Sequence, residues 1–121
     1  MRIEKVELRR LRLPLVKPFE TSFARVHDRT FLLVTLHGGG AEGWGECVAD
    51  DTPFYSAETA TAAWHVLKDF LVPMLTGVEL ASAADVWDRV ARVRGNQMAK
   101  AAIEMAAWDL EATQTGVPLW R

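Results

Sequence analysis

Three acidic residues near the middle of the chain, Glu46, Asp50 and Asp51, are the first candidates for chemistry. Strand alternation places Glu46 between Trp44 and Val48 on an otherwise apolar face, and a structural hydrogen bond is the simpler interpretation of that carboxylate. Asp50 and Asp51 could hold a cation, but a hard cation needs several further oxygen ligands. The start of a solvated loop is therefore the favoured interpretation for this pair.

The remaining polar residues form no recognisable catalytic set. His27, His37 and His65 are scattered over a predicted loop, a strand end and a helix, so we expect surface or half-buried side chains rather than metal ligands. The sequence has no nucleophile elbow, no glycine-rich phosphate loop and no zinc-spaced cysteines and histidines. Lys100 and Glu104 are four residues apart on a predicted helix and fit a simple ion pair.

Composition narrows the class of protein. A chain of 121 residues suffices for one domain with a real core. The net charge of −2 and the absence of a basic stripe argue against nucleic-acid binding. The one basic cluster, Arg9-Arg10-Leu11-Arg12, is short and lies inside a strand pattern. The single Cys47 excludes an internal disulfide and fits a reducing compartment. No apolar run reaches the roughly 18 residues that span a bilayer, and no signal peptide is evident, so we expect a soluble, cytoplasmic protein without a membrane partner.

The first half of the chain reads as strands separated by two aromatic-bearing loops. Residues 2–13 predict a strand in which Val6 and Leu8 lie on one face but Leu11 and Leu13 on the other, which suggests a bulge near Arg9-Arg10. Pro14 and Pro18 are expected to end its pairing. A long connection is then expected over 16–29, with Phe19 and Phe23 embedded in it. A buried strand over 30–37, a glycine reversal and a partner strand over 43–49 complete a hairpin, and a second loop covers 50–55.

Gly43 and Gly45 alternate with Trp44 on the last predicted strand. One face of this strand is therefore bare backbone, which predicts the close approach of another element.

The second half of the chain predicts three main helices. Ser56 is the expected N-cap of the first, and Pro73 should disturb its end. The pair Ser82 and Asp85 matches a capping box before a helix that runs to about Arg94 and stops at Gly95. The last helix is expected to begin at the N-cap Asn96 and to end at Gly116 and Pro118. Its predicted core stripe is Met98, Ala101, Ala102, Met105, Trp108 and Ala112, with Lys100 on the wet face.

Strands followed by helices predict an α+β fold: a three-stranded antiparallel meander and a bundle of three main helices in one domain, residues 1–121. From these residues alone, the chain is a domain with two aromatic loops and no catalytic machinery.

Four segments resemble a known family: PFETSF (18–23), GWGEC (43–47), PFYSAET (53–59) and RGNQMAKAAIEMAAWDL (94–110). In order and spacing they look like the N-terminal capping domain of the enolase superfamily. Within it they look most like the group of o-succinylbenzoate synthase, an enzyme of menaquinone biosynthesis, and N-succinylamino acid racemase. The match covers essentially the whole chain.

The resemblance implies a two-domain enzyme in which this cap closes two loops over the mouth of a (β/α) barrel and contacts a small carboxylate substrate. Carried over residue by residue, substrate-binding or specificity roles fall to Phe19, Thr21, Ser22, Phe23, Asp50, Asp51, Pro53, Phe54 and Tyr55. Aromatic side chains there would exclude water, and a hydroxyl such as that of Ser22 could hydrogen-bond a carboxylate or carbonyl.

The chemistry implied by the resemblance belongs to the barrel, where lysines move the proton α to a carboxylate and a bound Mg²⁺ stabilises the enediolate. None of Lys5, Lys17, Lys68 and Lys100 matches a catalytic position, so we expect no catalytic or metal residue in this chain and no activity from it alone. A barrel needs about 250 residues, and we expect it in a longer protein or as a separate chain. The complete enzyme is expected to be a homo-oligomer.

Two alternatives remain open. The first is the cap of a dipeptide epimerase or of a muconate cycloisomerase-like enzyme. The second is a free-standing small-molecule-binding or interaction domain without catalysis. The free-standing domain requires Trp44 and Trp108 to be fully internal, whereas a cap can leave them exposed.

Overall fold

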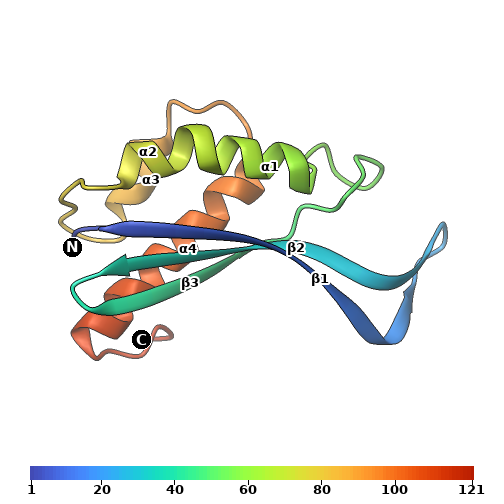
Figure 1. The fold of residues 1–121 in the computed structure, drawn as a ribbon, viewed down its shortest axis with the longest axis horizontal. Coiled ribbons are helices and arrows are strands. Elements are labelled where there is room, and N and C mark those ends of the chain that lie inside the picture. The colour runs from blue at the N-terminus through green and yellow to red at the C-terminus, as the bar shows by residue number, and fades with distance from the viewer.

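The computed structural model describes residues 1–121 as a three-stranded antiparallel sheet with helices packed on one face (Figure 1). The strands are β1 (Lys5–Glu20), β2 (Arg25–Gly38) and β3 (Ala41–Cys47), in the spatial order β1-β2-β3. The helical elements are α1 (Ala60–Val66), the π-helical turn η1 (Leu67–Leu71), α2 (Val72–Leu75), α3 (Asp85–Val90) and α4 (Gln97–Thr115). The predicted α+β architecture is confirmed.

Strands β1 and β2 extend beyond the helices as a two-stranded ribbon, at the right of Figure 1. The predicted connection over 16–29 is wrong, because only residues 21–24 lie outside the strands. Pairing is continuous up to Pro14, shifts once, and resumes at Phe19. The predicted bulge near Arg9-Arg10 is therefore misplaced. The irregularity surrounds the two prolines instead, since neither has an N–H to donate to a ladder.

The change of face in β1 has a different cause from a bulge. Val6 and Leu8 lie on the helix-covered face and pack against the core. At the same two-residue step, Arg10 lies opposite the buried Leu32, on that same face, where the apolar core stops. The leucines at 11 and 13 consequently lie on the other face, and the helices do not cover it.

Helix α4 lies directly against β3 because the strand offers it only backbone. A Cβ on Gly43 would stand 2.2 Å from the carbonyl oxygen of Ala106, and one on Gly45 would stand 2.0 Å from that of Ala102. Both alanines are fully buried. The predicted close approach is confirmed, and α4 is the element that approaches.

The buried face of α4 differs from the predicted stripe. Met105 and Trp108, expected in the core, are 45% and 39% exposed. Lys100, expected on the wet face, is buried; its ammonium donates a hydrogen bond to the Val93 carbonyl oxygen and lies 5.7 Å from the centre of the Trp87 ring. It therefore forms no ion pair with a carboxylate. The residues that are buried are Ala99, Lys100, Ala102, Ile103, Ala106, Ala107 and Leu110.

The starts of α1 and α4 are not capped by Ser56 and Asn96, the N-caps that the sequence predicts. Asn96 has a left-handed backbone (φ 56°) and its side chain donates to the Arg94 carbonyl, so it does not cap α4. The carboxylate of Glu58 instead accepts from the Met98 amide, at 2.9 and 3.1 Å. At α1 the cap is Thr59, whose hydroxyl accepts from the Ala62 amide at 3.3 Å.

The predicted helix stops are partly confirmed. Gly95 and Gly116 have φ of 61° and 68°, as expected of glycines that end a helix or its last turn. Helix α3 ends early, at Val90, and turns lead to Gly95. Pro73 lies in the disturbed end of the first helix, as predicted: the π turn η1 comes just before it, and α2 ends two residues after it, at Leu75.

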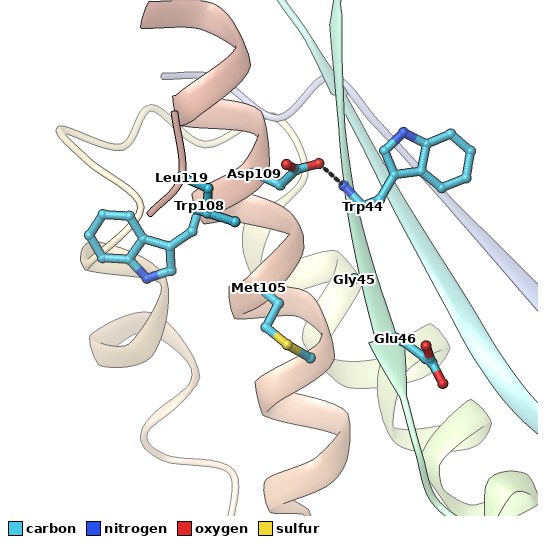
Figure 2. A pocket seen from close by; sticks show the side chains of 7 residues that line it. All are labelled: Trp44, Gly45, Glu46, Met105, Trp108, Asp109 and Leu119. Carbon is cyan, nitrogen blue, oxygen red and sulfur yellow. Dashed lines mark hydrogen bonds between the residues drawn. The ribbon is translucent and has the colours of Figure 1, made fainter. Parts of the chain in front are cut away.

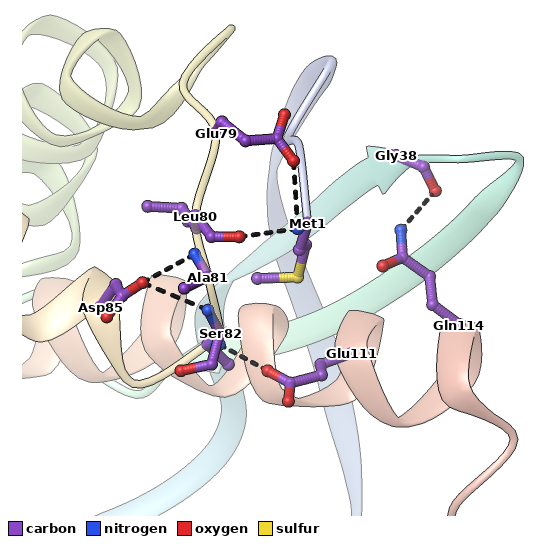
Figure 3. A network of polar contacts seen from close by, with 10 residues as sticks. Met1, Gly38, Glu79, Leu80, Ala81, Ser82, Asp85, Glu111 and Gln114 are labelled. Atoms are coloured by element: carbon purple, nitrogen blue, oxygen red, sulfur yellow. Dashed lines mark hydrogen bonds and ion pairs between the residues drawn. The ribbon is translucent and has the colours of Figure 1, made fainter.

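A polar network joins the chain start, the start of α3 and α4 (Figure 3). The Met1 amine donates to the Leu80 carbonyl at 2.7 Å. Asp85 accepts from the Ser82 amide at 3.2 Å, which is the reach-back bond expected of the predicted capping box. Glu111 of α4 accepts from the Ala83 amide, so the network fixes α3 against α4.

No helix of the structure is long and apolar enough to cross a membrane.

Candidate functional site

The first predicted loop is the tip of the β1–β2 ribbon. Residues 21–24 form a tight turn in which the Thr21 amide donates to the Ala24 carbonyl at 2.8 Å. The Thr21 hydroxyl also bonds the Ala24 backbone, with its oxygen 3.1 Å from the amide nitrogen. Phe19 and Phe23 flank this turn and are 62% and 70% exposed. The ribbon thus carries two aromatic rings, with the unpaired hydroxyl of Ser22 between them.

The second predicted loop leaves β3 and returns to α1. Its two ends are held together: Asp50 pairs with Thr59, and the Ala60 amide donates to the Asp50 carbonyl at 2.7 Å. Between these ends, Phe54 and Tyr55 are 87% and 82% exposed. Pro53 precedes them and is also exposed. The loop is closed at its base and carries aromatic side chains at its tip.

Both loops project from the same end of the sheet. The last residue of β3, Cys47, pairs with Leu32, while β2 begins at Arg25 on the far side of that pair. The chain after β3 therefore leaves the sheet toward the ribbon tip, as the right half of Figure 1 shows. The predicted site residues are brought to one end of the domain, although they come from segments about 30 positions apart in the sequence.

The two loop aspartates are engaged within the protein. Asp51 accepts a hydrogen bond from Arg10 at 2.8 Å. A hydrogen bond with the Thr30 hydroxyl, together with the Arg10 guanidinium, holds the pKa of the Asp51 carboxyl below its usual range. The carboxylate of Asp50 accepts from the Asp51 amide at 2.8 Å. These acids shape the loop, which leaves the aromatic residues and Ser22 as the groups open to a ligand.

The other acidic and nucleophilic candidates supply no catalytic constellation. Glu46 is exposed and makes no hydrogen bond, contrary to the structural bond expected of it. No group of three or more His, Cys, Asp or Glu side chains is arranged to hold a metal ion. Burial raises the pKa of the Cys47 thiol, which favours the unreactive protonated form. His65 pairs with Asp69 at 2.7 Å on the helix surface, away from both loops.

A second feature is a shallow hollow of about 640 Å³ between the free edge of β3 and the exposed side of α4 (Figure 2). Its lining residues are Trp44, Gly45, Glu46, Met105, Trp108, Asp109 and Leu119. The Trp44 amide, on the unpaired edge of β3, donates to Asp109 at 2.9 Å. The apolar side chains on the helix side of the hollow are Met105 and Trp108, whereas the Trp44 ring points away from α4.

Nearly the whole chain matches a known protein family. The chain matches the N-terminal domain model of the mandelate racemase / muconate lactonizing enzyme family over residues 4–121. It belongs to this family.

Two relatives illustrate the likeness. The chain is 48% identical over 118 residues to an o-succinylbenzoate synthase from Geobacillus kaustophilus, covering 97% of this chain and 32% of that protein. It is 46% identical over 121 residues to an N-succinylamino acid racemase from Thermus thermophilus, covering 100% of this chain and 33% of the relative. The chain thus spans about a third of the length of the curated relatives it matches.

Solved structures of related proteins have the same fold as this chain. A member of the enolase superfamily from Listeria innocua superposes with a TM-score of 0.88 at 33% identity, over 95% of this chain and 31% of that one. The L-Ala-D/L-Glu epimerase from Bacillus subtilis superposes with a TM-score of 0.86, also at 33% identity, over 99% of this chain and 33% of that one. The fold is that of an enolase-superfamily N-terminal domain, and the barrel is absent from this chain.

Sequence reasoning missed residues that matter to the site. The sequence places Arg10 in a basic strand cluster, yet its side chain donates to Asp51 of the second loop. Glu58 is not among the expected site residues, yet it lies at the end of that loop and accepts a hydrogen bond from the Met98 amide at the start of α4. The two-residue step from Val6 through Leu8 to Arg10 was the available signal for the first of these, because it puts the guanidinium on the helix side of the sheet.

Proposed function

We propose that this chain is the capping and specificity domain of an enzyme that removes the proton α to a substrate carboxylate. The reaction is either the dehydration that forms o-succinylbenzoate or the racemisation of an N-acylamino acid. Both begin with the same proton abstraction and pass through the same kind of enediolate. The observation that carries the proposal is the convergence of two aromatic loops at one end of a domain shared with relatives named for these two activities.

In this proposal the loops bind the substrate and exclude water, and they perform no bond-making step. Phe19, Phe23, Phe54 and Tyr55 provide exposed rings that can cover the apolar part of a bound acyl or ring group. Ser22 lies between two of them and can donate a hydrogen bond to a carbonyl or carboxylate oxygen. Water exclusion strengthens the electrostatic interactions made by the rest of the enzyme with the enediolate.

The metal of the proposed enzyme, Mg²⁺, is assigned to the barrel. Magnesium prefers an octahedral set of oxygen ligands, and no cluster of acidic side chains in this chain offers one. Asp50 and Asp51, the nearest pair, are occupied by a backbone amide and by Arg10. When bound in the barrel, the ion supplies charge stabilisation for the enediolate.

We further propose that the hollow beside β3 contacts the barrel, carried by the same protein or by another chain. Met105 and Trp108 of α4 are 45% and 39% exposed, and Trp44, whose ring points away from α4, is 43% exposed (Figure 2). A free-standing domain was expected to hold both tryptophans inside, so their exposure favours a cap over a domain that works alone. Large exposed apolar side chains are typical of surfaces buried in an assembly, and here they lie on α4 and on the edge strand β3.

A dipeptide epimerase is the second candidate activity, because the L-Ala-D/L-Glu epimerase superposes closely on this chain. The fold alone does not separate this activity from the first pair. The relatives at 46–48% identity favour the succinylated substrates.

The deciding experiment begins with the intact mass of the native gene product and ends with an assay. A mass close to the 13.5 kDa of this chain would contradict the two-domain proposal unless a barrel chain co-purifies. The complete protein is then assayed with the cyclohexadiene precursor of o-succinylbenzoate, with N-succinyl amino acids and with dipeptides. Turnover of dipeptides alone would favour the epimerase.

Phe23→Ala in the complete protein tests the role of the loops. The ring is 70% exposed here, so its removal should leave the fold intact. Loss of one apolar contact should raise KM by about tenfold and leave metal affinity unchanged. Phe70→Ala is the matched control, since Phe70 is 48% exposed on the helix surface away from both loops. A loss of Mg²⁺ affinity in Phe23→Ala would show that the role of the loop is wrongly assigned.

A further inference from the structure

Arg10 connects the stem of the first loop to both ends of the second. It lies on β1, the strand that leads to the ribbon tip. Its Nη2 donates to Asp51 Oδ1 at 2.8 Å, and its Nη1 donates to Thr61 Oγ1 at 2.8 Å. Asp51 opens the second loop and Thr61 follows it on α1, so one guanidinium holds both flanks of that loop.

The tip of the second loop depends on these flanks for its position. Phe54 and Tyr55 are almost fully exposed, so contacts of their own do not fix them. On the far flank, the Glu58 carboxylate accepts from a single amide of α4, that of Met98. On the near flank, the Arg10 side chain ties Asp51 to β1, and the Thr30 hydroxyl ties it to β2.

The neighbouring Arg12 pairs with a different carboxylate, so it does not replace the Arg10 guanidinium at Asp51. Arg12, the next residue on the same face, pairs with Asp28 of β2 at 2.6 Å. Thr30 supports the Asp51 carboxylate from β2. A planar guanidinium can hold a carboxylate and a hydroxyl at once in fixed directions, which a lysine ammonium does less well.

We propose that Arg10 is a positioning residue for substrate binding: by holding Asp51 and Thr61 it keeps the aromatic tip of the second loop at a fixed place relative to the ribbon tip. Asp51 is then the partner of Arg10 and not a substrate contact. This inference rests on the proposed function of the two loops as the substrate-facing part of the cap.

The test uses Arg10→Met in the complete protein, with Arg9→Met as the matched control. Arg9 is the adjacent residue and also makes an ion pair, with Glu7 at 2.8 Å, but it lies on the opposite face and touches neither loop. The first readout is the rate of chymotrypsin cleavage after Phe54 and Tyr55, which reports loop mobility without reference to activity. We expect Arg10→Met to raise this rate severalfold and Arg9→Met to leave it unchanged.

The second readout separates KM from kcat. Loss of an exposed pair with two hydrogen bonds should raise KM roughly two- to tenfold, with kcat and Mg²⁺ affinity unchanged. Arg10→Lys should recover part of the loss. Asp51→Asn should mimic Arg10→Met, and the double variant should be no worse than either single one, because both remove the same link.

The outcomes distinguish this inference from the proposed function. If Phe23→Ala raises KM but Arg10→Met behaves like Arg9→Met in both readouts, Arg10 has no positioning role and the function of the loops stands. If Phe23→Ala leaves KM unchanged, the proposed function fails, and the cleavage assay still decides whether Arg10 holds the loop. Additive effects of Arg10→Met and Asp51→Asn would also overturn the link.

Discussion

Two glycines decide how closely helix and sheet approach each other in this domain. Gly43 and Gly45 lie on the face of β3 that meets α4, where carbonyl oxygens of the helix occupy the space of a side chain. Between them, Trp44 points to the other side of the sheet and is 43% exposed. The alternation of glycine and tryptophan therefore serves two surfaces at once, an internal contact without side chains and an external apolar one.

Gly45→Ala should destabilise the protein strongly. The added Cβ would stand 2.0 Å from the Ala102 oxygen and 2.9 Å from the Ala106 nitrogen, both backbone atoms that cannot move alone. Overpacking of this kind costs about 1–3 kcal/mol or more, and the midpoint of thermal unfolding of the complete protein measures it. Gly40→Asn is the control, because a side chain there meets nothing within 4 Å and asparagine tolerates the positive φ of 76°. Equal losses in both variants would mean that α4 does not approach β3 this closely.

At the scale of elements, α4 explains what the sequence could and could not predict. Its existence, its length and its glycine stop follow from local signals, namely helical periodicity and Gly116. Its orientation does not, because the helix carries two apolar stripes with the same period. Periodicity favours the larger residues, Met105 and Trp108, yet the structure buries the alanines. Only the complementarity between small helix residues and a glycine strand selects the inner face, and that is a tertiary contact.

The strand β1 illustrates the same limit. The alternation of its apolar residues predicts a bulge only on the assumption that one face stays apolar along the whole strand. The structure instead ends the helix layer at Arg10, so the inner face becomes charged and the outer face carries Leu11 and Leu13. Local sequence gives the strand, but which side is covered depends on elements that follow 50 or more positions later.

The start of α4 is held by an acid from another segment, which gives an element-scale prediction. Removal of a helix cap costs about 0.5–2 kcal/mol. Glu58→Ala should therefore lower the free energy of unfolding by about this amount, since the Met98 amide loses both contacts. Asn96→Gly should cause little loss, because the Asn96 side chain does not cap and glycine accepts its φ of 56°. Chemical unfolding of both variants provides the comparison, and a larger loss for Asn96→Gly would assign the cap to Asn96 after all.

At the scale of the whole molecule, apolar side chains are buried under the helices but remain exposed around the free edge of β3. The helices bury 21 apolar residues in a single cluster on the inner face of the sheet. Around the free edge of β3, Trp44, Met105 and Trp108 remain between 39% and 45% exposed. This is the surface that we propose contacts the barrel.

Trp108→Glu should therefore have different effects in the complete protein and in the isolated 121-residue chain. In the isolated chain the substitution should lower the unfolding midpoint through lost packing and repulsion from Glu104, and it should weaken the binding of an anilinonaphthalene dye. In the complete protein, a carboxylate forced against an apolar partner surface loses its water, which costs about 2 kcal/mol or more. Thermal unfolding of four samples, each form with and without the substitution, measures this difference, and circular dichroism checks that the isolated chain is folded. If Trp108→Glu costs the same in both forms, the side chain does not meet the barrel, and the hollow beside β3 is not the docking surface.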